Sequence, residues 1–81
     1  MPSVFDRVAK TIGRVLMIKV SSVNPESTAR DFDGWDSVTH TYIILSLEEE
    51  FGVELPVEET VSVENVGGLA QLIETELAQR A

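Results

Sequence analysis

The sequence predicts an all-α fold, a small four-helix bundle with three long helices, one short helix and a long loop between helices 1 and 2. Apolar residues recur at helical spacing in three separate segments, and residues that favour helix ends lie at the boundaries of these segments. No segment alternates polar and apolar residues for long enough to indicate a strand. The length of 81 residues fits a single domain, residues 1–81.

The first helix is expected to start after residue 3 and to run to about residue 18. Ser3 is a good N-cap, and Asp6 follows at the spacing of a capping box. The apolar residues then follow the 3.6-residue period of a helix: Val4, Phe5, Val8, Ile12, Val15 and Leu16. Gly13 inside this helix costs about 1 kcal/mol relative to alanine.

Helical periodicity is absent from residue 21 to residue 35. The pairs Asn24-Pro25 and Asp33-Gly34 are turn signals. A loop this long in a small domain is either functional or held in place by its own apolar residues. We expect Val23, Phe32 and Trp35 to pack against the bundle.

The remaining helices are delimited by similar signals. Asp36 is a good N-cap for the second helix, which is expected to end near Phe51 and Gly52. Residues 56–60 allow one short helix with proline in its first turn. Ser62 is expected to cap the last helix, whose apolar residues are Val63, Val66, Leu69, Ala70, Ile73 and Leu77. The pair Gly67-Gly68 weakens its second turn, and the sequence alone gives no reason for it.

The second helix has two apolar sides. At 100° per residue, Ile43, Ile44, Leu47 and Phe51 form one face, which also includes His40 and which we expect to face the core. Val38, Tyr42 and Leu45 form a second stripe that is nearly opposite, and Ser37, Thr41 and Glu48 border it. This stripe either packs against the short helix or the long loop, or it is a docking surface for a partner, with Glu48 and Glu49 as its charged rim.

The net charge of −8 is unevenly distributed along the chain. Residues 1–19 carry four basic residues against Asp6, a net charge of +3; residues 20–81 carry 13 acidic residues against Arg30 and Arg80, a net charge of −11. An acidic surface repels nucleic acid and anionic membranes and attracts basic partners, although solubility alone is an equally good explanation.

The composition argues against a disulfide framework, a thiolate zinc site and a membrane-spanning segment. The chain has no cysteine, and so it has no disulfide framework and no thiolate zinc site. Its first residues do not resemble a signal peptide, and no apolar run is as long as a membrane span. We therefore expect a cytoplasmic protein without membrane insertion.

Ser37 is the best candidate for covalent chemistry. It follows the Asp36 cap at the start of a well-patterned helix, at the end of a loop that displays it. A phosphate on its hydroxyl would lie near the positive end of the helix dipole, an interaction worth about 0.3–1 kcal/mol. The alternative from these residues alone is that Ser37 only helps to cap the helix.

The whole chain resembles acyl carrier proteins. The similarity includes Val23-Asn24-Pro25-Glu26, Gly34-Trp35-Asp36-Ser37-Val38, Ser62-Val63-Glu64-Asn65-Val66 and, as its most specific part, residues 47–56. The resemblance implies that a phosphopantetheinyl transferase attaches 4′-phosphopantetheine from coenzyme A to Ser37, next to Asp36. It also implies a monomeric carrier without catalytic activity of its own, whose partners are acyl-loading, elongating or acyl-transfer enzymes. The expected partner-binding residues are Val38, Thr41, Tyr42, Leu45, Glu48 and Glu49.

The chain departs from the usual pattern of the family at four positions. Val38 replaces the usual leucine, Thr39 and Tyr42 stand where fatty-acid carriers usually have acidic residues, and Trp35 precedes the aspartate. These differences favour a specialised lipid or polyketide-type pathway over housekeeping fatty-acid synthesis. An aminoacyl or peptidyl carrier is an alternative, although such carriers usually have a glycine-rich approach to the serine.

Parts of the sequence are compatible with three other functions. Ser37 and His40 could meet on one helical turn beside Asp36, but such close neighbours do not easily align as a catalytic triad. Residues 31–36 are similar to a calcium loop, but the glycine is misplaced and Tyr42 stands where a glutamate is needed, so no metal site is expected. A noncovalent helical adaptor using the stripe from Val38 to Leu45 stays open.

Overall fold

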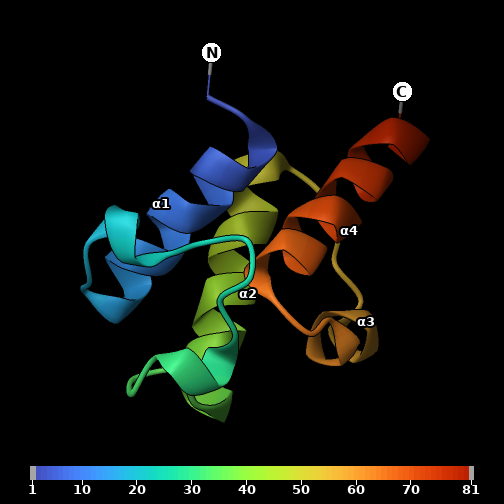
Figure 1. Cartoon of the computed structure of the whole chain (residues 1–81). Coiled ribbons are helices and arrows are strands. Elements are labelled where there is room, and N and C mark those ends of the chain that lie inside the picture. The colour runs from blue at the N-terminus through green and yellow to red at the C-terminus, as the bar shows by residue number, and fades with distance from the viewer. Residues whose placement is uncertain (1, 81) are drawn as a thin grey trace.

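The computed structural model describes residues 2–80, and the side chain of residue 80 is not among the described atoms. Its α-helices are α1 (Val4–Leu16), α2 (Ser37–Phe51), α3 (Val57–Ser62) and α4 (Val66–Arg80). Two 3₁₀ turns, η1 (Val20–Ser22) and η2 (Ala29–Asp31), lie in the loop between α1 and α2. Residues 2–80 contain no strand, so the predicted all-α fold with three long helices and one short helix is confirmed (Figure 1).

The core lies between α1, α2 and α4, and α1 packs against both of the others. Residues from all three helices are almost completely buried, including Val8, Ile12, Ile43, Leu47, Leu69 and Ile73. The segment between α2 and α3 adds Val53 and Leu55. α3 lies at the side of this core, beside α4 (Figure 1).

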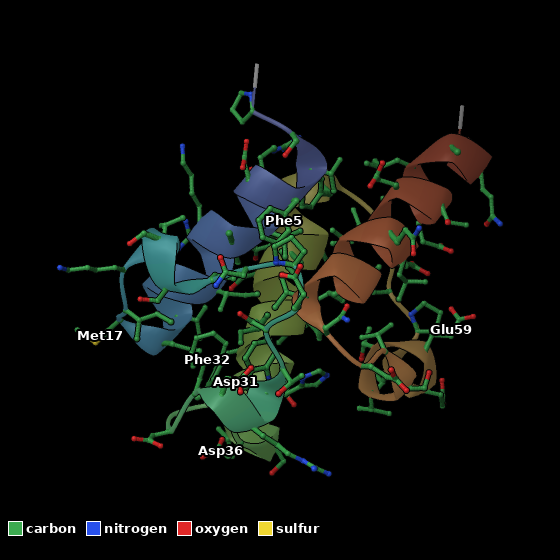
Figure 2. All side chains as sticks on the ribbon, in the orientation of Figure 1. Phe5, Met17, Asp31, Phe32, Asp36 and Glu59 are labelled. Atoms are coloured by element: carbon green, nitrogen blue, oxygen red, sulfur yellow. The ribbon has the colours of Figure 1, made fainter. Side chains whose placement is uncertain are left out.

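α1 begins as expected and ends two residues earlier than expected. Ser3 Oγ accepts a hydrogen bond from the Asp6 amide at 3.0 Å, which completes the predicted capping box with the Asp6 carboxylate. Met17 adopts the left-handed conformation (φ 59°), and Gly13 O accepts hydrogen bonds from the amides of Met17 and Ile18, so the helix stops at Leu16. The prediction that α1 reaches residue 18 was therefore wrong. The exposed Met17 side chain projects away from the bundle (Figure 2).

The prediction that Ser62 caps the last helix was also wrong. Ser62 is the last residue of α3, and its hydroxyl donates to Glu59 O at 3.0 Å. α4 begins only at Val66, where Asn65 Oδ1 accepts a hydrogen bond from the Gly68 amide at 2.8 Å. Asn65 thus makes the contact of an N-cap in place of Ser62.

Gly67 permits a close contact between the long loop and α4. Its amide donates to Pro25 O at 2.8 Å, and a Cβ atom at this position would lie 3.1 Å from the same oxygen. The neighbouring Val66 amide donates to Ser27 O at 2.9 Å. The loop thus supplies acceptors for two amides in the first turn of α4, which would otherwise lack partners inside the helix.

The apolar residues of the long loop pack as the sequence predicts. Val23 is buried, and Phe32 and Trp35 are half-buried against the core with their ring centroids 6.0 Å apart. Ser27 is buried and accepts a hydrogen bond from the Asn24 amide. These contacts hold the loop and fix the point at which the chain enters α2.

Within residues 2–80 no helix has both the length and the apolar character required to cross a membrane.

Candidate functional site

The start of α2 is fixed by a reciprocal pair of hydrogen bonds between Asp36 and Thr39. Asp36 Oδ1 accepts from the Thr39 amide at 2.9 Å, and Thr39 Oγ1 accepts from the Asp36 amide at 2.8 Å. The Thr39 hydroxyl donates to Gly34 O at 2.7 Å, which ties the end of the loop to the helix. The bond from the Thr39 amide lowers the pKa of Asp36 below its ordinary value. Asp36 is therefore an ionised N-cap at neutral pH.

Ser37 is the first residue of α2, and its side chain is exposed. The capping oxygen belongs to Asp36, so the alternative in which Ser37 caps the helix does not hold. The Ser37 carbonyl accepts from the Thr41 hydroxyl, whereas the Ser37 hydroxyl has no hydrogen-bond partner among residues 2–80. This hydroxyl is free for covalent chemistry at the amino end of a helix.

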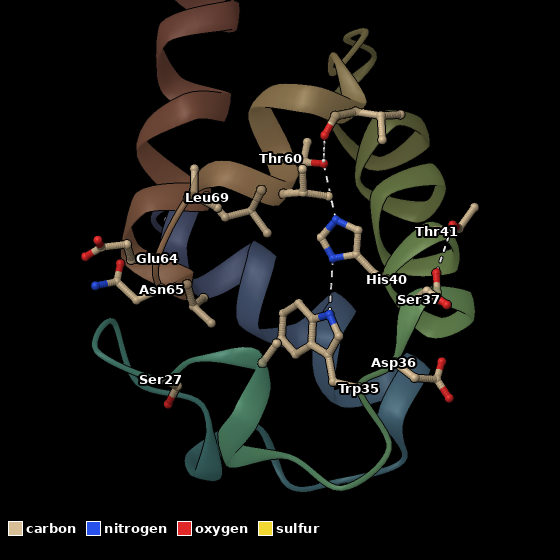
Figure 3. A pocket seen from close by; sticks show the side chains of 15 residues that line it. Ser27, Trp35, Asp36, Ser37, His40, Thr41, Thr60, Glu64, Asn65 and Leu69 are labelled. Carbon is tan, nitrogen blue, oxygen red and sulfur yellow. Dashed lines mark hydrogen bonds between the residues drawn. The ribbon is translucent and has the colours of Figure 1, made fainter.

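A groove of about 490 Å³ lies next to Ser37. It runs between the start of α2, α3 and the start of α4, and the end of the loop forms another wall (Figure 3). Its apolar lining comes mainly from Val57, Val61, Val63, Val66 and Leu69. The groove can therefore take an apolar chain that begins near the serine.

His40 lies inside this groove and joins two of its walls. Trp35 Nε1 donates to His40 Nδ1 at 3.2 Å, and His40 Nε2 lies 3.2 Å from Thr60 Oγ1. Because the Thr60 hydroxyl already donates to Val57 O, it accepts from His40, which fixes the neutral imidazole with its proton on Nε2. Burial lowers the pKa of His40 and favours the same neutral form.

These bonds argue against a catalytic pair of Ser37 and His40. Both imidazole nitrogens are used by Trp35 and Thr60, so neither is left to act as a base toward the serine. The structure instead gives His40 the half-buried structural position that its place on the core side of the helical wheel predicts.

The second apolar stripe of α2 faces solvent. Val38, Tyr42 and Leu45 are 61%, 59% and 53% exposed, and Thr41 and Glu49 are exposed beside them. The alternative in which this stripe packs against the short helix or the long loop is therefore wrong. Val57 and Val61 of α3 add to the exposed apolar surface.

Glu48 has a structural contact that sequence reasoning missed. One of its carboxylate oxygens accepts a hydrogen bond from the Leu55 amide at 2.8 Å, and its side chain is half-buried. The bond ties the segment after α2 back to the helix. No signal in the sequence indicates it, because Leu55 lies outside α2, in the irregular segment that follows the helix. Replacement of Glu48 would therefore alter stability as well as any contact with a partner.

Among residues 2–80 no group of three or more histidine, cysteine, aspartate or glutamate side chains is arranged to hold a metal ion.

Comparison with known proteins identifies the family. Residues 6–73 match the family model described as a phosphopantetheine attachment site. The chain is 34% identical over 67 residues to the acyl carrier protein AcpXL of Mesorhizobium japonicum, covering 83% of this chain and 72% of the relative. It is 33% identical over 72 residues to an acyl carrier protein of Helicobacter pylori, covering 89% of this chain and 92% of the relative.

A solved structure agrees with this result. The solution structure of the holo acyl carrier protein from Geobacter metallireducens superposes with a TM-score of 0.84 at 31% identity, covering 99% of this chain and 91% of that one. The fold and the site define a small helical carrier, and the chain belongs to the acyl carrier protein family. Its cofactor is covalently bound 4′-phosphopantetheine. Proteins of this family are carriers that work with a phosphopantetheinyl transferase and with separate biosynthetic enzymes.

Proposed function

We propose that Ser37 carries the 4′-phosphopantetheine and that the chain presents acyl intermediates on this arm to separate biosynthetic enzymes. The observation that carries the proposal is the free, exposed hydroxyl of Ser37 beside the groove. The serines near the other helix ends differ, because Ser3 Oγ is engaged by the Asp6 amide and the Ser62 hydroxyl by Glu59 O.

The residues around Ser37 fit a 4′-phosphopantetheine group attached to its hydroxyl. The rigid Asp36 and Thr39 network holds the hydroxyl at the helix end, and the amino end of α2 stabilises a phosphodiester there by about 0.3–1 kcal/mol. The bound arm supplies a thiol, which holds the acyl group as a thioester. The groove beside Ser37 then shields the apolar part of the cargo from water.

The exposed stripe of α2 is the surface we assign to partner enzymes. It consists of Val38, Thr41, Tyr42 and Leu45, with Glu48 and Glu49 at its rim. Exposed apolar side chains beside acidic ones suit brief contacts with basic partners. The same surface would serve a noncovalent adaptor, which differs from a carrier in leaving Ser37 unmodified.

A specialised lipid or polyketide-type pathway is favoured over housekeeping fatty-acid synthesis. Thr39 and Tyr42 stand where acidic residues are usual, and the Thr39 side chain is committed to the Asp36 cap. Tyr42 instead offers a large, exposed aromatic ring to a partner. An aminoacyl or peptidyl cargo is the second candidate, and loading assays with acyl and aminoacyl donors separate the two.

Intact-mass spectrometry tests the attachment site. With coenzyme A and a phosphopantetheinyl transferase, the protein should gain the mass of one phosphopantetheine group. Ser37→Ala should abolish the gain, whereas Ser62→Ala should leave it unchanged. Labelling that persists in Ser37→Ala would contradict the assignment, and no gain in the unaltered protein would favour the adaptor.

A further inference from the structure

The outer face of α1 is basic, although the protein as a whole is acidic. Residues 7–19 contain four basic residues and no acidic one. Three of them, Arg7, Lys10 and Arg14, lie within about 60° of one another around the helix, on the side opposite the core. Lys10 and Arg14 are exposed, and Arg7 is half-buried. Neither the attachment of phosphopantetheine nor the exposed stripe of α2 accounts for this basic face.

Most of the positive charge on this face is not neutralised within the molecule. Among residues 2–80 the one ion pair joins Arg7 to Glu50, at the end of α2. Lys10 and Arg14 therefore have no carboxylate partner in that part of the chain. A hollow of about 410 Å³ lies beside them, and Arg7 and Glu50 also line it. Unpaired cations that line a hollow attract carboxylates of another molecule.

Met17 adds a large apolar side chain next to the basic residues. It follows Arg14 by three residues, on the turn that ends α1, and its side chain is 90% exposed. Among residues 2–80 it is the one residue other than glycine with a positive φ, a conformation that glycine adopts at a lower free energy. Its side chain adds almost no burial to the fold that would offset this strain. Exposed methionine side chains are common where one protein contacts another.

The basic face is separate from the site around Ser37. All of the residues that line the groove lie between residues 27 and 69, outside α1. Glu50, which meets α1, is at the opposite end of α2 from Ser37. Figure 2 shows Met17 at one edge of the molecule and Glu59 of α3 at the opposite edge. A partner bound to α1 therefore leaves the groove uncovered.

We propose that Lys10, Arg14 and Met17 form a second docking surface and that its partner is an acidic helix of another protein. Lys10 and Arg14 are four residues apart, about 6 Å along the helix axis, which matches two glutamates four residues apart on a facing helix. Small residues beside those glutamates leave room for the Met17 side chain. The rest of the molecule repels an acidic partner and so directs it to α1.

An anionic membrane matches this face less well than an acidic helix does. Residues 20–81 carry a net charge of −11, and an extended anionic surface would repel them. A single helix covers only the basic face and avoids most of that repulsion. The apolar part of the face is also small, because Met17 and the 44% exposed Val20 are its large apolar side chains.

The Met17 methyl group allows a direct test by nuclear magnetic resonance. A ¹³C label on methionine methyl groups reports on Met17, since the other methionine is Met1. The protein is titrated with a helical peptide whose glutamates lie four residues apart among alanines, at about 0.1 M salt, where the screening length is about 10 Å. We expect the Met17 methyl resonance to shift to saturation and the amides of residues 7–19 to shift more than those of α2. The same peptide with glutamine in place of glutamate should cause no shift.

Charge reversal on the basic face should weaken the binding of the acidic peptide. Lys10→Glu replaces an attraction by a repulsion, so the dissociation constant should rise about fivefold or more. Arg30→Glu is the matched control, because Arg30 is equally exposed, lies in η2 outside the basic face and loses the same charge. It should change the dissociation constant by less than about twofold. Arg14→Glu gives a second charge reversal if Lys10→Glu does not fold.

Met17→Gly separates the apolar contact from the charges. Glycine accepts the left-handed conformation, so the midpoint of thermal unfolding should not fall. The dissociation constant of the acidic peptide should nevertheless rise about threefold or more, because the apolar contact is lost.

Four results would overturn the proposal. The first is an equal loss of binding in Lys10→Glu and Arg30→Glu, and the second is a peptide that shifts mainly resonances of α2 or leaves the Met17 methyl unchanged. The third is a shift of the Met17 methyl with phosphatidylglycerol vesicles and not with the peptide, which would assign the face to a membrane. The fourth is a doubled mass in sedimentation without peptide that Lys10→Glu abolishes, which would assign the face to a second copy of the chain.

Discussion

At the scale of single residues, His40 is held neutral by its surroundings. Burial lowers its pKa, and Nδ1 must keep its lone pair to accept the Trp35 hydrogen bond. In the unfolded chain the imidazole binds a proton near pH 6.5, whereas the folded protein binds it only at lower pH. Between these two pKa values the unfolded state therefore holds more protons, and stability falls as the pH falls.

We therefore expect the midpoint of thermal unfolding to decrease when the pH is lowered from about 7.5 to about 5.5. Most carboxylates stay ionised over this range, since their ordinary pKa values lie near 4. His40→Gln removes the titrating group and should melt at nearly the same temperature at both pH values. An equal pH effect in both proteins would contradict this role for His40.

At the scale of one element, α2 has an inner and an outer face, and leucines on the two faces should respond differently to truncation. Leu47 is completely buried, so Leu47→Ala should lower the free energy of unfolding by about 2–5 kcal/mol. Leu45 is 53% exposed, so Leu45→Ala should leave stability nearly unchanged and slow transfer or acyl-loading reactions. Urea titrations and loading rates check the two effects. If Leu45→Ala destabilises the fold as much as Leu47→Ala, the outer face of α2 is packed within the protein and is not open to partners.

The faces of α2 could be predicted because a regular helix fixes the direction of each side chain. The inner face is buried as expected, at Ile43, Ile44, Leu47 and Phe51. The Ser37 hydroxyl is free because the preceding residue, Asp36, caps the helix. The start of α4 could not be predicted in this way. Ser62 and Asn65 are both good caps, and the choice depends on the loop carbonyls of Pro25 and Ser27, which are distant in sequence.

The contact between His40 and Thr60 was equally hidden from sequence reasoning. His40 and Thr60 are 20 residues apart, and each side chain alone has an ordinary local explanation. His40 fits the core side of α2, and Thr60 bonds back to Val57 O within α3. Only the packing of α3 beside α2 brings the two together.

At the scale of the whole molecule, the uneven charge should oppose folding. Residues 20–81 carry 13 acidic residues, and one ion pair is present among residues 2–80, between Arg7 Nε and Glu50 Oε2 at 2.9 Å. The same guanidinium also donates to Glu50 O and lies 4.3 Å from the centre of the Phe51 ring. Arg7 thus neutralises one carboxylate at the end of α2, while the carboxylates of Glu49, Glu58 and Glu59 lie exposed.

We expect the midpoint of thermal unfolding to rise with added sodium chloride and to rise further with millimolar magnesium or calcium. Salt shortens the range of repulsion to about 8 Å at physiological ionic strength, and divalent cations neutralise clustered carboxylates more effectively. Melting curves at low and physiological salt measure the effect. Glu49→Lys reverses one exposed charge of α2 and should raise the midpoint at low salt and reduce the salt response.

The opposing view is that the acidic residues lie far enough apart for their repulsion to be weak. The melting midpoint would then stay constant from low to physiological salt, and Glu49→Lys would have no effect on it. The acidic residues on α2 would then act only by attracting basic partners. Such attraction changes the association rate and leaves stability unchanged. Measuring the salt dependence of both the melting midpoint and the rate of phosphopantetheine transfer distinguishes the two: repulsion within the fold changes the first, and attraction of the transferase changes the second.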